Sequence, residues 1–405
     1  MKIATATKDY IFSVGGNVLK KFEKNHSYVM SELLMKDIMA TAGTMLFGMI
    51  RDLDSKTYKK YNGESLDGKT ITIWRTGGMG DLCFITPYLK KIKEIYPTSK
   101  IIFGCGAQYA EVMCDHKYID EFHNLPMDTE IMSRSDFHLM FEGIIEANSE
   151  ATKKNAYDLF GEYFCIQLED HEKVPNLTVV EDSLKYFQEL EKKYIKDPQP
   201  IKIGIHLKTS SKIRNVPIFI WTKLINEMFE MWPNVCIYLL GSHEDADVGN
   251  KISYGEKAVG KVLPFFALTR NFRDSIAAIS EMNLIIGGDS SGLHTAAAFG
   301  KPMVGLFGAF QSKLRLATYQ NAIGMDSKIR CSPCFLHGNE PCDNSDLEGE
   351  SYCMKIFDTQ DIISEVGTLL CINEKIDLNL LPAKSVMMAL SFYKEKNKEK
   401  QTNEA

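Results

Sequence analysis

Long apolar runs are missing from this 405-residue chain. No stretch approaches the roughly 20 consecutive apolar residues that a membrane-spanning helix needs. The first residues, 1–16, also lack the apolar core and cleavage site of a secretory signal peptide. The sequence therefore predicts a cytoplasmic protein without a transmembrane segment.

A strong charge of either sign is missing as well. The chain has 47 Lys and Arg against 53 Asp and Glu, a formal net charge of -6, so it offers no general positive field for nucleic acid. The net charge does not exclude a local basic groove that binds nucleic acid. With 44% hydrophobic residues the composition is that of an ordinary globular protein, and the length predicts two or three domains.

Cysteine is present in quantity, with ten residues. In a cytoplasmic protein they are normally reduced, so a cluster favours metal binding over disulfides. Four thiols in a short segment predict a tetrahedral structural Zn or Fe site. Their irregular spacing leaves a redox-sensitive cluster or ordinary structural cysteines open. The four are Cys331, Cys334, Cys342 and Cys353.

The stretch from Asn283 to Phe310 combines a strand, a loop, a helix and a strand with almost no filler. Leu284–Ile286 is a short apolar run bounded by two glycines, and Gly300-Lys301-Pro302 ends the helix before the apolar run Met303–Phe307. Apolar periodicity and these boundary residues predict a βαβ unit.

The loop of this unit is a candidate phosphate site. It follows the carboxyl end of a strand and precedes a helix, where backbone N–H groups and the helix dipole favour an anion. An ordinary βα turn capped by the aspartate is the alternative. The candidate phosphate-binding residues here are Asp289, Ser290, Ser291, Gly292, Leu293 and His294.

A second glycine-rich turn lies earlier in the chain. We predict a strand over Ile71–Trp74, a helix over Leu82–Tyr96 and the next strand over Lys100–Gly104, which together begin another doubly wound unit. The turn between them, Arg75–Asp81, does not have the G-x-G-x-x-G spacing of a dinucleotide site.

Asp81 is the candidate catalytic residue of this turn. The helix dipole stabilises a carboxylate in the first helical turn, and Gly77, Gly78 and Gly80 would let an acceptor approach closely. The alternative is an aspartate that only caps the helix.

Taken together, the two turns resemble those of the ADP-heptose:lipopolysaccharide heptosyltransferase family, glycosyltransferase family 9. Arg75–Asp81, with Thr86-Pro87 following, matches the early motif, and Asp289–His294 matches the late Asp-Ser-Gly-x-x-His motif with one extra serine. The resemblance covers about residues 70 to 360.

The resemblance implies a GT-B fold, an α/β architecture of two Rossmann-like domains that face a cleft, with the acceptor on the first and the nucleotide-sugar on the second. Asp81 would act as general base while the nucleotide leaves from the opposite face of the sugar, which gives inversion. The amides of Ser290–Leu293 and Arg214 would balance the diphosphate charge. We therefore expect no cofactor or metal ion in catalysis.

Arg214 is a candidate because its segment, Arg214–Pro217 with Trp221 following, resembles a Lys-x-Trp-Pro segment of the family. Lys212 and Lys208 are close alternatives for the phosphate contact, and a solvated basic loop also stays open. Gly241 follows the apolar run Val235–Leu240 at a position suited to the nucleoside.

The predicted domains are an N-terminal appendage over 1–68, an acceptor domain over 69–198, a nucleotide-sugar domain over 199–370 with its Cys-rich segment at 331–353, and a helix with a charged tail over 371–405. In the appendage we predict a hairpin of Val18–Phe22 with His26–Met30, then a helix capped by Ser31, in a ββα-type arrangement. Its role could be oligomerisation, docking or simple structural extension.

The predicted function is transfer of a heptose-like sugar from a nucleotide-diphosphate donor such as ADP-heptose to an acceptor hydroxyl of lipopolysaccharide or another glycan. One alternative is a transferase of the same fold that acts on a protein or a hydroxylated DNA base. The other is a nucleotide-sugar-binding protein without catalysis. Residues 116–168, which lack strong periodicity, are interpreted as acceptor-binding loops.

Overall fold

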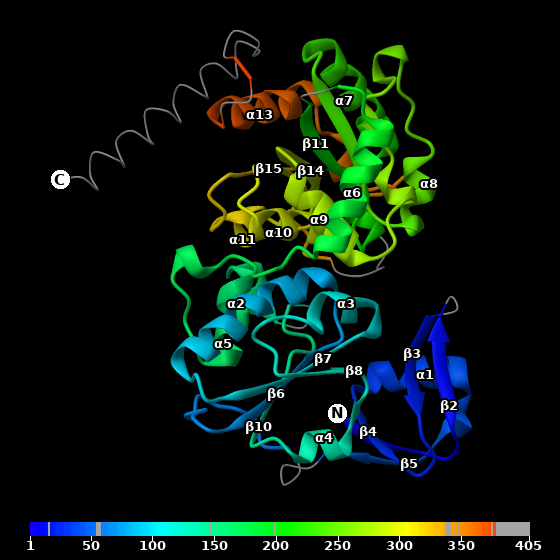
Figure 1. The fold of residues 1–405 in the computed structure, drawn as a ribbon, viewed down its shortest axis with the longest axis vertical. Coiled ribbons are helices and arrows are strands. Elements are labelled where there is room, and N and C mark those ends of the chain that lie inside the picture. The colour runs from blue at the N-terminus through cyan, green and yellow to red at the C-terminus, as the bar shows by residue number, and fades with distance from the viewer. Residues whose placement is uncertain are drawn as a thin grey trace, which may run out of the picture. The chain divides into compact units, whose positions relative to one another are not determined.

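The computed structural model describes residues 1–14, 17–53, 58–145, 148–197, 200–336, 342–346, 349–373 and 376–377. The chain divides into two compact units, Met1–Leu177 and Thr178–Ala405 (Figure 1). The division falls before α6 (Glu181–Tyr194), whereas the sequence predicts the boundary between the acceptor and nucleotide-sugar domains near residue 198. The limits of these two domains stay predictions. Of the helix and charged tail predicted over 371–405, only residues 371–373 and 376–377 are described, and helix α13 (Thr359–Ile372) runs across the predicted start.

The appendage at the start of the first unit is mainly β-structure. The hairpin predicted for Val18–Phe22 and His26–Met30 is wrong, because the first run pairs with β2 and the second with β1, both antiparallel. The strand Lys2–Ala6 was missed because its alternating alanines and threonines give a weak β signal. The elements are β1 (Lys2–Ala6), β2 (Tyr10–Val14), β3 (Asn17–Phe22), β4 (Ser27–Met30), α1 (Glu32–Ala42), η1 (Thr44–Leu46) and β5 (Phe47–Asp52).

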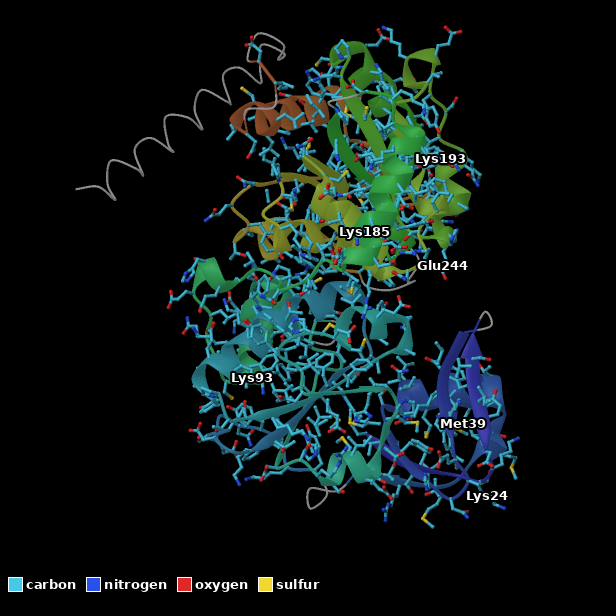
Figure 2. All side chains as sticks on the ribbon, in the orientation of Figure 1. Lys24, Met39, Lys93, Lys185, Lys193 and Glu244 are labelled. Atoms are coloured by element: carbon cyan, nitrogen blue, oxygen red, sulfur yellow. The ribbon has the colours of Figure 1, made fainter. Side chains whose placement is uncertain are left out.

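Helix α1 forms as its capping residues predict. The Ser31 hydroxyl accepts a hydrogen bond from the Leu34 N–H at 3.1 Å, and Gly43 ends the helix with φ 88°. Ile38 is fully buried in the appendage core, and Met39, labelled on this helix in Figure 2, packs against that core.

The appendage shares its sheet with the rest of the first unit. The strand order is β5-β1-β4-β9, in which β9 (Met127–Asp128) comes from far along the chain. A buried cluster joins Ile3 and Val29 of the appendage to Trp74 and Met127 of the following domain. The appendage and this domain therefore pack as one body.

A parallel four-stranded sheet in the order β10-β6-β7-β8 forms the centre of the first unit. The chain runs from β6 outward to β7 and β8 and then returns to β10 on the other side of β6. A topological switch point lies between β6 and β10, where ligands bind in open α/β sheets. The elements are β6 (Thr70–Arg75), α2 (Met79–Ile95), β7 (Lys100–Cys105), α3 (Ala110–Met113), β8 (Glu121–Asn124), α4 (Thr129–Ser133), β10 (Phe137–Met140) and α5 (Ala156–Phe164).

Two features of this sheet differ from expectation. Helix α2 begins at Met79, three residues earlier than predicted, because Gly78 in extended conformation serves as its N-cap. Residues 116–168 include β10 and α5 rather than loops alone, and α5 buries Leu159 and Phe160. The first of these changes places Asp81 within the first turn of the helix.

The second unit contains a six-stranded parallel sheet in the order β13-β12-β11-β14-β15-β16. The chain runs from β11 to β12 and β13 and then crosses to β14, so the switch point lies between β11 and β14. The strands are β11 (Ile201–His206), β12 (Val235–Leu240), β13 (Val262–Leu263), β14 (Leu284–Gly288), β15 (Met303–Phe307) and β16 (Ala322–Asp326).

Helices cover both faces of this sheet (Figure 1). Residues of α7 and α13 share a large apolar core with the sheet, including Trp221, Ile237 and Val366. The aromatic side chains of Phe187 on α6 and Tyr238 on β12 meet on the other face. The helices are α7 (Ile218–Met231), α8 (Ala246–Gly249), α9 (Phe272–Glu281), α10 (Ser291–Ala298), α11 (Lys313–Leu316), α12 (Tyr352–Lys355) and α13 (Thr359–Ile372).

Strands Val235–Leu240 and Met303–Phe307 and the loop-to-helix step after β14 are confirmed as predicted. Among the described residues, no helix has the length and apolar character to cross a membrane.

Candidate active site

The first candidate site lies at the switch point of the first unit. Arg75 ends β6, and Phe141 and Glu142 follow the neighbouring strand β10. Asp81 stands in the first turn of α2, which follows β6 directly. Carboxyl ends of adjacent parallel strands therefore bring together residues that are 66 positions apart in the sequence.

Asp81 forms an ion pair with a buried arginine. The Arg75 Nη2 lies 2.7 Å from the Asp81 Oδ2, and the Arg75 side chain is 2% exposed whereas that of Asp81 is 18% exposed. Arg75 also donates through Nη1 to the Phe141 carbonyl. The structure therefore pairs the predicted base with a cation and leaves it partly open to solvent.

The glycines of this turn differ in the space that a side chain would have at each position. A Cβ on Gly77 would lie 2.4 Å from the Arg75 Nε, so this position must be glycine because the guanidinium packs beneath it. A Cβ on Gly78 would meet nothing within 4 Å, so an approaching molecule has room there. Gly80 lies beside Asp81 in the first turn of α2. Packing against Arg75 therefore accounts for the glycine at position 77, whereas the space beside Gly78 is open.

A second carboxylate, Glu142, holds the same turn. It accepts hydrogen bonds from the Thr76 N–H at 3.0 Å and from the Thr76 hydroxyl at 2.5 Å. Tyr109, which precedes α3, also lies near Asp81: burial raises the pKa of Tyr109, and the charge of Asp81 adds to that rise. The turn is thus held by a residue that follows β10.

The second candidate site lies at the switch point of the second unit. Arg214, in the 3₁₀ turn η5 (Lys212–Arg214), donates through Nη1 to the Asp289 carboxylate and to the Asp289 carbonyl, each at 3.0 Å. Its Nη2 donates to the Ser210 hydroxyl at 2.9 Å. Asp289 therefore pairs with Arg214 instead of capping α10, whose N-cap is Ser290.

Two arginines surround this one aspartate. Burial alone would raise the pKa of Asp289, but Arg214 and Arg315 outweigh it and hold the pKa below its usual value. Arg315 on α11 is 4% exposed, and its guanidinium lies 4.9 Å from the centre of the Phe310 ring. Because two cations face one carboxylate, the cluster has an excess positive charge that suits an anionic ligand.

His294 is neutral at pH 7 in this cluster. Burial, opposed in part by Asp289, lowers the pKa of His294 to about 4. Its Nδ1 lies 3.0 Å from the hydroxyl oxygen of Tyr319. His294 can therefore contribute a hydrogen bond to a ligand but no positive charge.

The loop before α10 packs against β11. The Ser290 hydroxyl lies 3.3 Å from the Nδ1 of His206, and a Cβ on Gly292 would lie 2.4 Å from the His206 ring. Leu293 is buried, so only its backbone is available to a ligand, and Ser291 begins the helix. Gly292 is therefore needed for close packing of α10 on His206.

The structure separates the basic candidates. Lys208 pairs with Asp247 at 3.0 Å and Lys212 is exposed, so Arg214 is the candidate that contacts Asp289. Gly241 follows β12 with φ 148°, and a Cβ there would lie 2.1 Å from the Asp245 carboxylate. Asp245 in turn accepts the Ser242 N–H at 2.8 Å.

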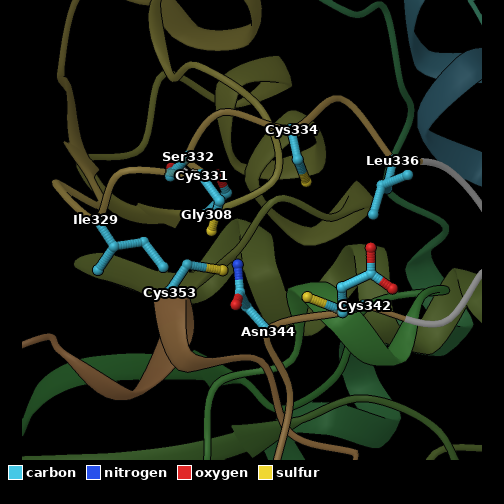
Figure 3. Close-up of a pocket in the computed structure, with 10 residues that line it drawn as sticks. Gly308, Ile329, Cys331, Ser332, Cys334, Leu336, Cys342, Asn344 and Cys353 are labelled. Atoms are coloured by element: carbon cyan, nitrogen blue, oxygen red, sulfur yellow. Dashed lines mark hydrogen bonds between the residues drawn. The ribbon is translucent and has the colours of Figure 1, made fainter.

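The four clustered cysteines line one pocket (Figure 3). Burial, together with the neighbouring thiols of Cys334, Cys342 and Cys331, raises the pKa of Cys353 to about 12. Across the residues with described positions, no group of three or more His, Cys, Asp or Glu side chains is arranged to hold a metal ion. The cysteines thus share a pocket without a closed ligand geometry.

Arg214, the partner of Asp289, is a predicted site residue, whereas Arg75, the partner of Asp81, is predicted only as part of a turn. No local pattern marks His206, which lies beside Ser290. Glu142, Arg315 and Tyr319 carry no local motif. Their placement depends on strand order, because each comes from a segment that folds beside the site.

Comparison with known proteins gives a match between residues 145–341 and the sequence model of glycosyltransferase family 9 (heptosyltransferase). This segment, just under half of the chain, is similar to that family, in agreement with the resemblance seen in the sequence. The matched segment includes Arg214 and the Asp289–His294 loop and begins beyond Asp81. No curated protein matches the chain.

Solved structures share the fold of this chain. They include heptosyltransferase II, an ADP-heptose lipopolysaccharide heptosyltransferase of E. coli, with TM-score 0.58 and 15% identity over 76% of this chain and 99% of that chain. A family 9 glycosyltransferase from Veillonella parvula gives TM-score 0.54 and 16% identity over 76% and 98%.

A third structure, the iron-containing dodecameric glycosyltransferase TibC of enterotoxigenic E. coli, gives TM-score 0.52 and 10% identity over 91% of this chain and 90% of that chain. At these identities the likeness establishes the fold. The GT-B architecture predicted from the sequence is therefore confirmed, and residues 145–341 carry the likeness to the heptosyltransferase family.

Proposed function

We propose that the protein is an inverting glycosyltransferase that moves a heptose-like sugar from a nucleotide-diphosphate donor, such as ADP-heptose, to an acceptor hydroxyl of lipopolysaccharide or another glycan. The observation that carries the proposal is the chemistry at the two switch points. One holds a partly exposed carboxylate, Asp81, and the other holds two arginines around one aspartate.

The donor is assigned to the second unit. A diphosphate carries negative charge. The cluster of Arg214, Asp289 and Arg315 has one more positive than negative side chain, and this net positive charge can neutralise part of the diphosphate charge. The first turn of α10 presents backbone N–H groups, and its dipole favours an anion. The loop after β12, which includes Gly241, is proposed for the nucleoside.

The acceptor is assigned to the first unit. Asp81 removes the proton from the acceptor hydroxyl, which attacks the anomeric carbon as the nucleoside diphosphate leaves from the opposite face. Attack from the face opposite the leaving group inverts the anomeric configuration. Arg214 and the α10 amides stabilise the charge that develops on the diphosphate, so the proposed chemistry needs no divalent ion.

A nucleotide-sugar screen by thermal shift tests the function. A ligand at 100 times its Kd stabilises a fold by about 2.7 kcal/mol, so millimolar ADP-heptose should raise the melting temperature clearly. UDP-, GDP- and CMP-sugars serve as competitors in the same screen. If no nucleotide-sugar shifts the melting temperature at millimolar concentration, the proposed function is wrong.

We also propose that Cys331, Cys334, Cys342 and Cys353 bind one Zn or Fe ion. Soft thiolate ligands suit both metals, and the pocket brings all four together. The fold likeness to an iron-containing transferase supports the assignment. When bound, the ion would hold these ligands together and stabilise the fold, and it takes no part in transfer.

Metal analysis of the purified protein should find about one Zn or Fe per chain. The double change Cys331→Ser/Cys334→Ser should remove the metal, because two of four ligands are lost. The matched control Cys114→Ser/Cys165→Ser changes cysteines outside the pocket and should keep it. A metal-free native preparation with full activity would exclude the site.

We propose that the appendage associates with further copies of the chain. It exposes large apolar side chains, among them Leu33 at 71%, Met45 at 79% and Met49 at 63%. Apolar side chains gathered on one part of a surface are typical of an interaction site. A structurally similar transferase is dodecameric. These two observations together support self-association.

We also propose that the protein acts in the cytoplasm, where its ten cysteines would stay reduced.

Light scattering should give a particle mass of at least twice the 45.8 kDa of one chain. Leu33→Lys/Met45→Lys should reduce that mass, because burying two lysines costs more than the apolar contact gains. Val259→Lys, an exposed apolar position in the second unit, is the control. A parent protein that is monomeric at high concentration contradicts the proposal.

A further inference from the structure

Arg75 is a buried cation that is held by hydrogen bonds to two other segments of the chain. It ends β6 with 2% of its side chain exposed. One guanidinium nitrogen donates to the Phe141 carbonyl after β10, and another donates to Asp81 on α2 at 2.7 Å. The side chain therefore links two neighbouring strands to the helix that carries the proposed base.

The backbone above Arg75 is shaped to accept it. A Cβ on Gly77 would lie 2.4 Å from Nε, 2.5 Å from Nη2 and 2.6 Å from Cζ of Arg75. The turn thus closes directly over the guanidinium plane. Thr76, beside Gly77, is held by Glu142 through two hydrogen bonds. A side chain packed in this way has little freedom to move away from Asp81.

A burial argument alone does not explain why an arginine is placed here. Removing a guanidinium from water costs several kcal/mol, and an apolar residue of similar size often serves stability equally well. The planar guanidinium instead offers hydrogen bonds in fixed directions, which a lysine does not. Arg75 donates to Oδ2 of Asp81, and we assign the other carboxylate oxygen, Oδ1, to the acceptor proton.

We propose that Arg75 is the positioning residue of Asp81: it fixes the orientation of the carboxylate so that Oδ1 faces the acceptor hydroxyl. This inference rests on the proposed function. Arg75 does not touch the substrate, and its effect on turnover passes through Asp81. Positioning within about 1 Å matters, since a misplacement of that size can cost 10²-fold in rate.

A double-mutant cycle tests the proposal, with ADP release from ADP-heptose as the assay. Arg75→Met should lower kcat by about 10²-fold in the parent. The same change should have almost no further effect in an Asp81→Asn background, because the carboxylate that Arg75 orients is then absent. Arg75→Lys should recover part of the loss, since it keeps the charge but not the planar geometry.

Several controls separate positioning from folding. The stoichiometry of ADP binding gives the concentration of folded protein, so kcat is expressed per folded chain. The double variant carries no uncompensated buried charge and should fold well even if Arg75→Met alone does not. Lys69→Met removes a cation paired with Asp136 at the opposite end of β6 and should leave kcat unchanged.

The possible outcomes distinguish the inference from the function. An equal loss from Arg75→Met in both backgrounds would overturn positioning and leave Asp81 as the base. Full activity of Asp81→Asn would remove the base assignment itself. The proposal is supported if Arg75→Met lowers kcat in the parent, which has Asp81, but not in the Asp81→Asn variant, and if the affinity for ADP is unchanged.

Discussion

Replacing Asp81 by Asn should lower kcat by about 10²–10⁴-fold and leave the donor Kd close to that of the parent. General-base catalysis typically contributes this much to a rate, and asparagine cannot take up a proton. Donor affinity should be preserved because the proposed diphosphate contacts lie in the second unit. The measurements are kcat for nucleotide release and Kd for ADP by thermal shift.

Asparagine is the informative replacement because the local contacts can persist. In the Asp81→Asn variant the amide oxygen can still accept from the Arg75 guanidinium, and the side chain keeps its place in the first turn of α2. The variant does leave Arg75 buried beside a neutral partner, so some loss of stability is expected. Expressing kcat per folded chain removes that contribution from the comparison.

Glu142 provides the competing assignment. Its carboxylate lies at the same switch point, but both oxygens already accept hydrogen bonds from Thr76. Glu142→Gln should therefore disturb the turn without removing the base, and its loss should be smaller than that of Asp81→Asn. If the order of the two losses is reversed, the base is Glu142 and Asp81 has a capping role.

Local sequence signals predicted the two turns because each signal depends on neighbouring residues. The glycine-rich turn after β6 and the Gly-Gly-Asp loop after β14 both connect a strand to a helix within a few positions, and both lie where predicted. The early start of α2 is a boundary error. It arises because glycine at an N-cap gives a weaker signal than serine or threonine.

Apart from Arg214, the residues that surround the two aspartates could not be predicted in the same way. The turn that Arg75 and Asp81 share is fixed by Phe141 and Glu142, which are about 66 residues away and adjacent only because β10 pairs with β6. Arg315, whose charge helps to lower the pKa of Asp289, lies on α11, after a further helix and strand. Strand order is a property of the whole sheet, and no short window of sequence contains it.

The same limit explains the error in the appendage. Residues 18–22 and 26–30 are close in sequence and both suit strands, so a hairpin is the simplest pairing. The structure instead pairs β4 with β1 and with β9, and Val29 is fully buried in the cluster that this pairing creates. Burial against a distant strand outweighed proximity along the chain.

Removing the carboxylate of Asp289 should have the largest effect on stability. Asp289→Ala leaves Arg214 and Arg315 together without a counter-charge, and breaking a buried ion pair typically costs about 3–5 kcal/mol. In a unit of this size that corresponds to a fall of roughly 6–20 °C in the melting temperature. Chemical denaturation followed by tryptophan fluorescence measures the change, since Trp221 and Trp232 are buried in the same unit.

Removing both charges should separate stability from donor binding. The double variant Arg214→Met/Asp289→Asn has no unpaired charge from this contact, so it should recover most of the lost stability. It should nevertheless lose the ADP-induced thermal shift, because Arg214 is the proposed diphosphate contact. Lys208→Met/Asp247→Asn removes a more exposed ion pair after β11 and serves as the stability control.

Two results would contradict this account of the donor site. A parental ADP shift in Arg214→Met/Asp289→Asn would mean that Arg214 is purely structural and that Arg315 or the α10 amides bind the diphosphate unaided. A cost below about 1 kcal/mol for Asp289→Ala would mean that Asp289 behaves as an exposed ion-pair partner. The first result changes the donor contact, and the second removes the charge balance on which the anion site depends.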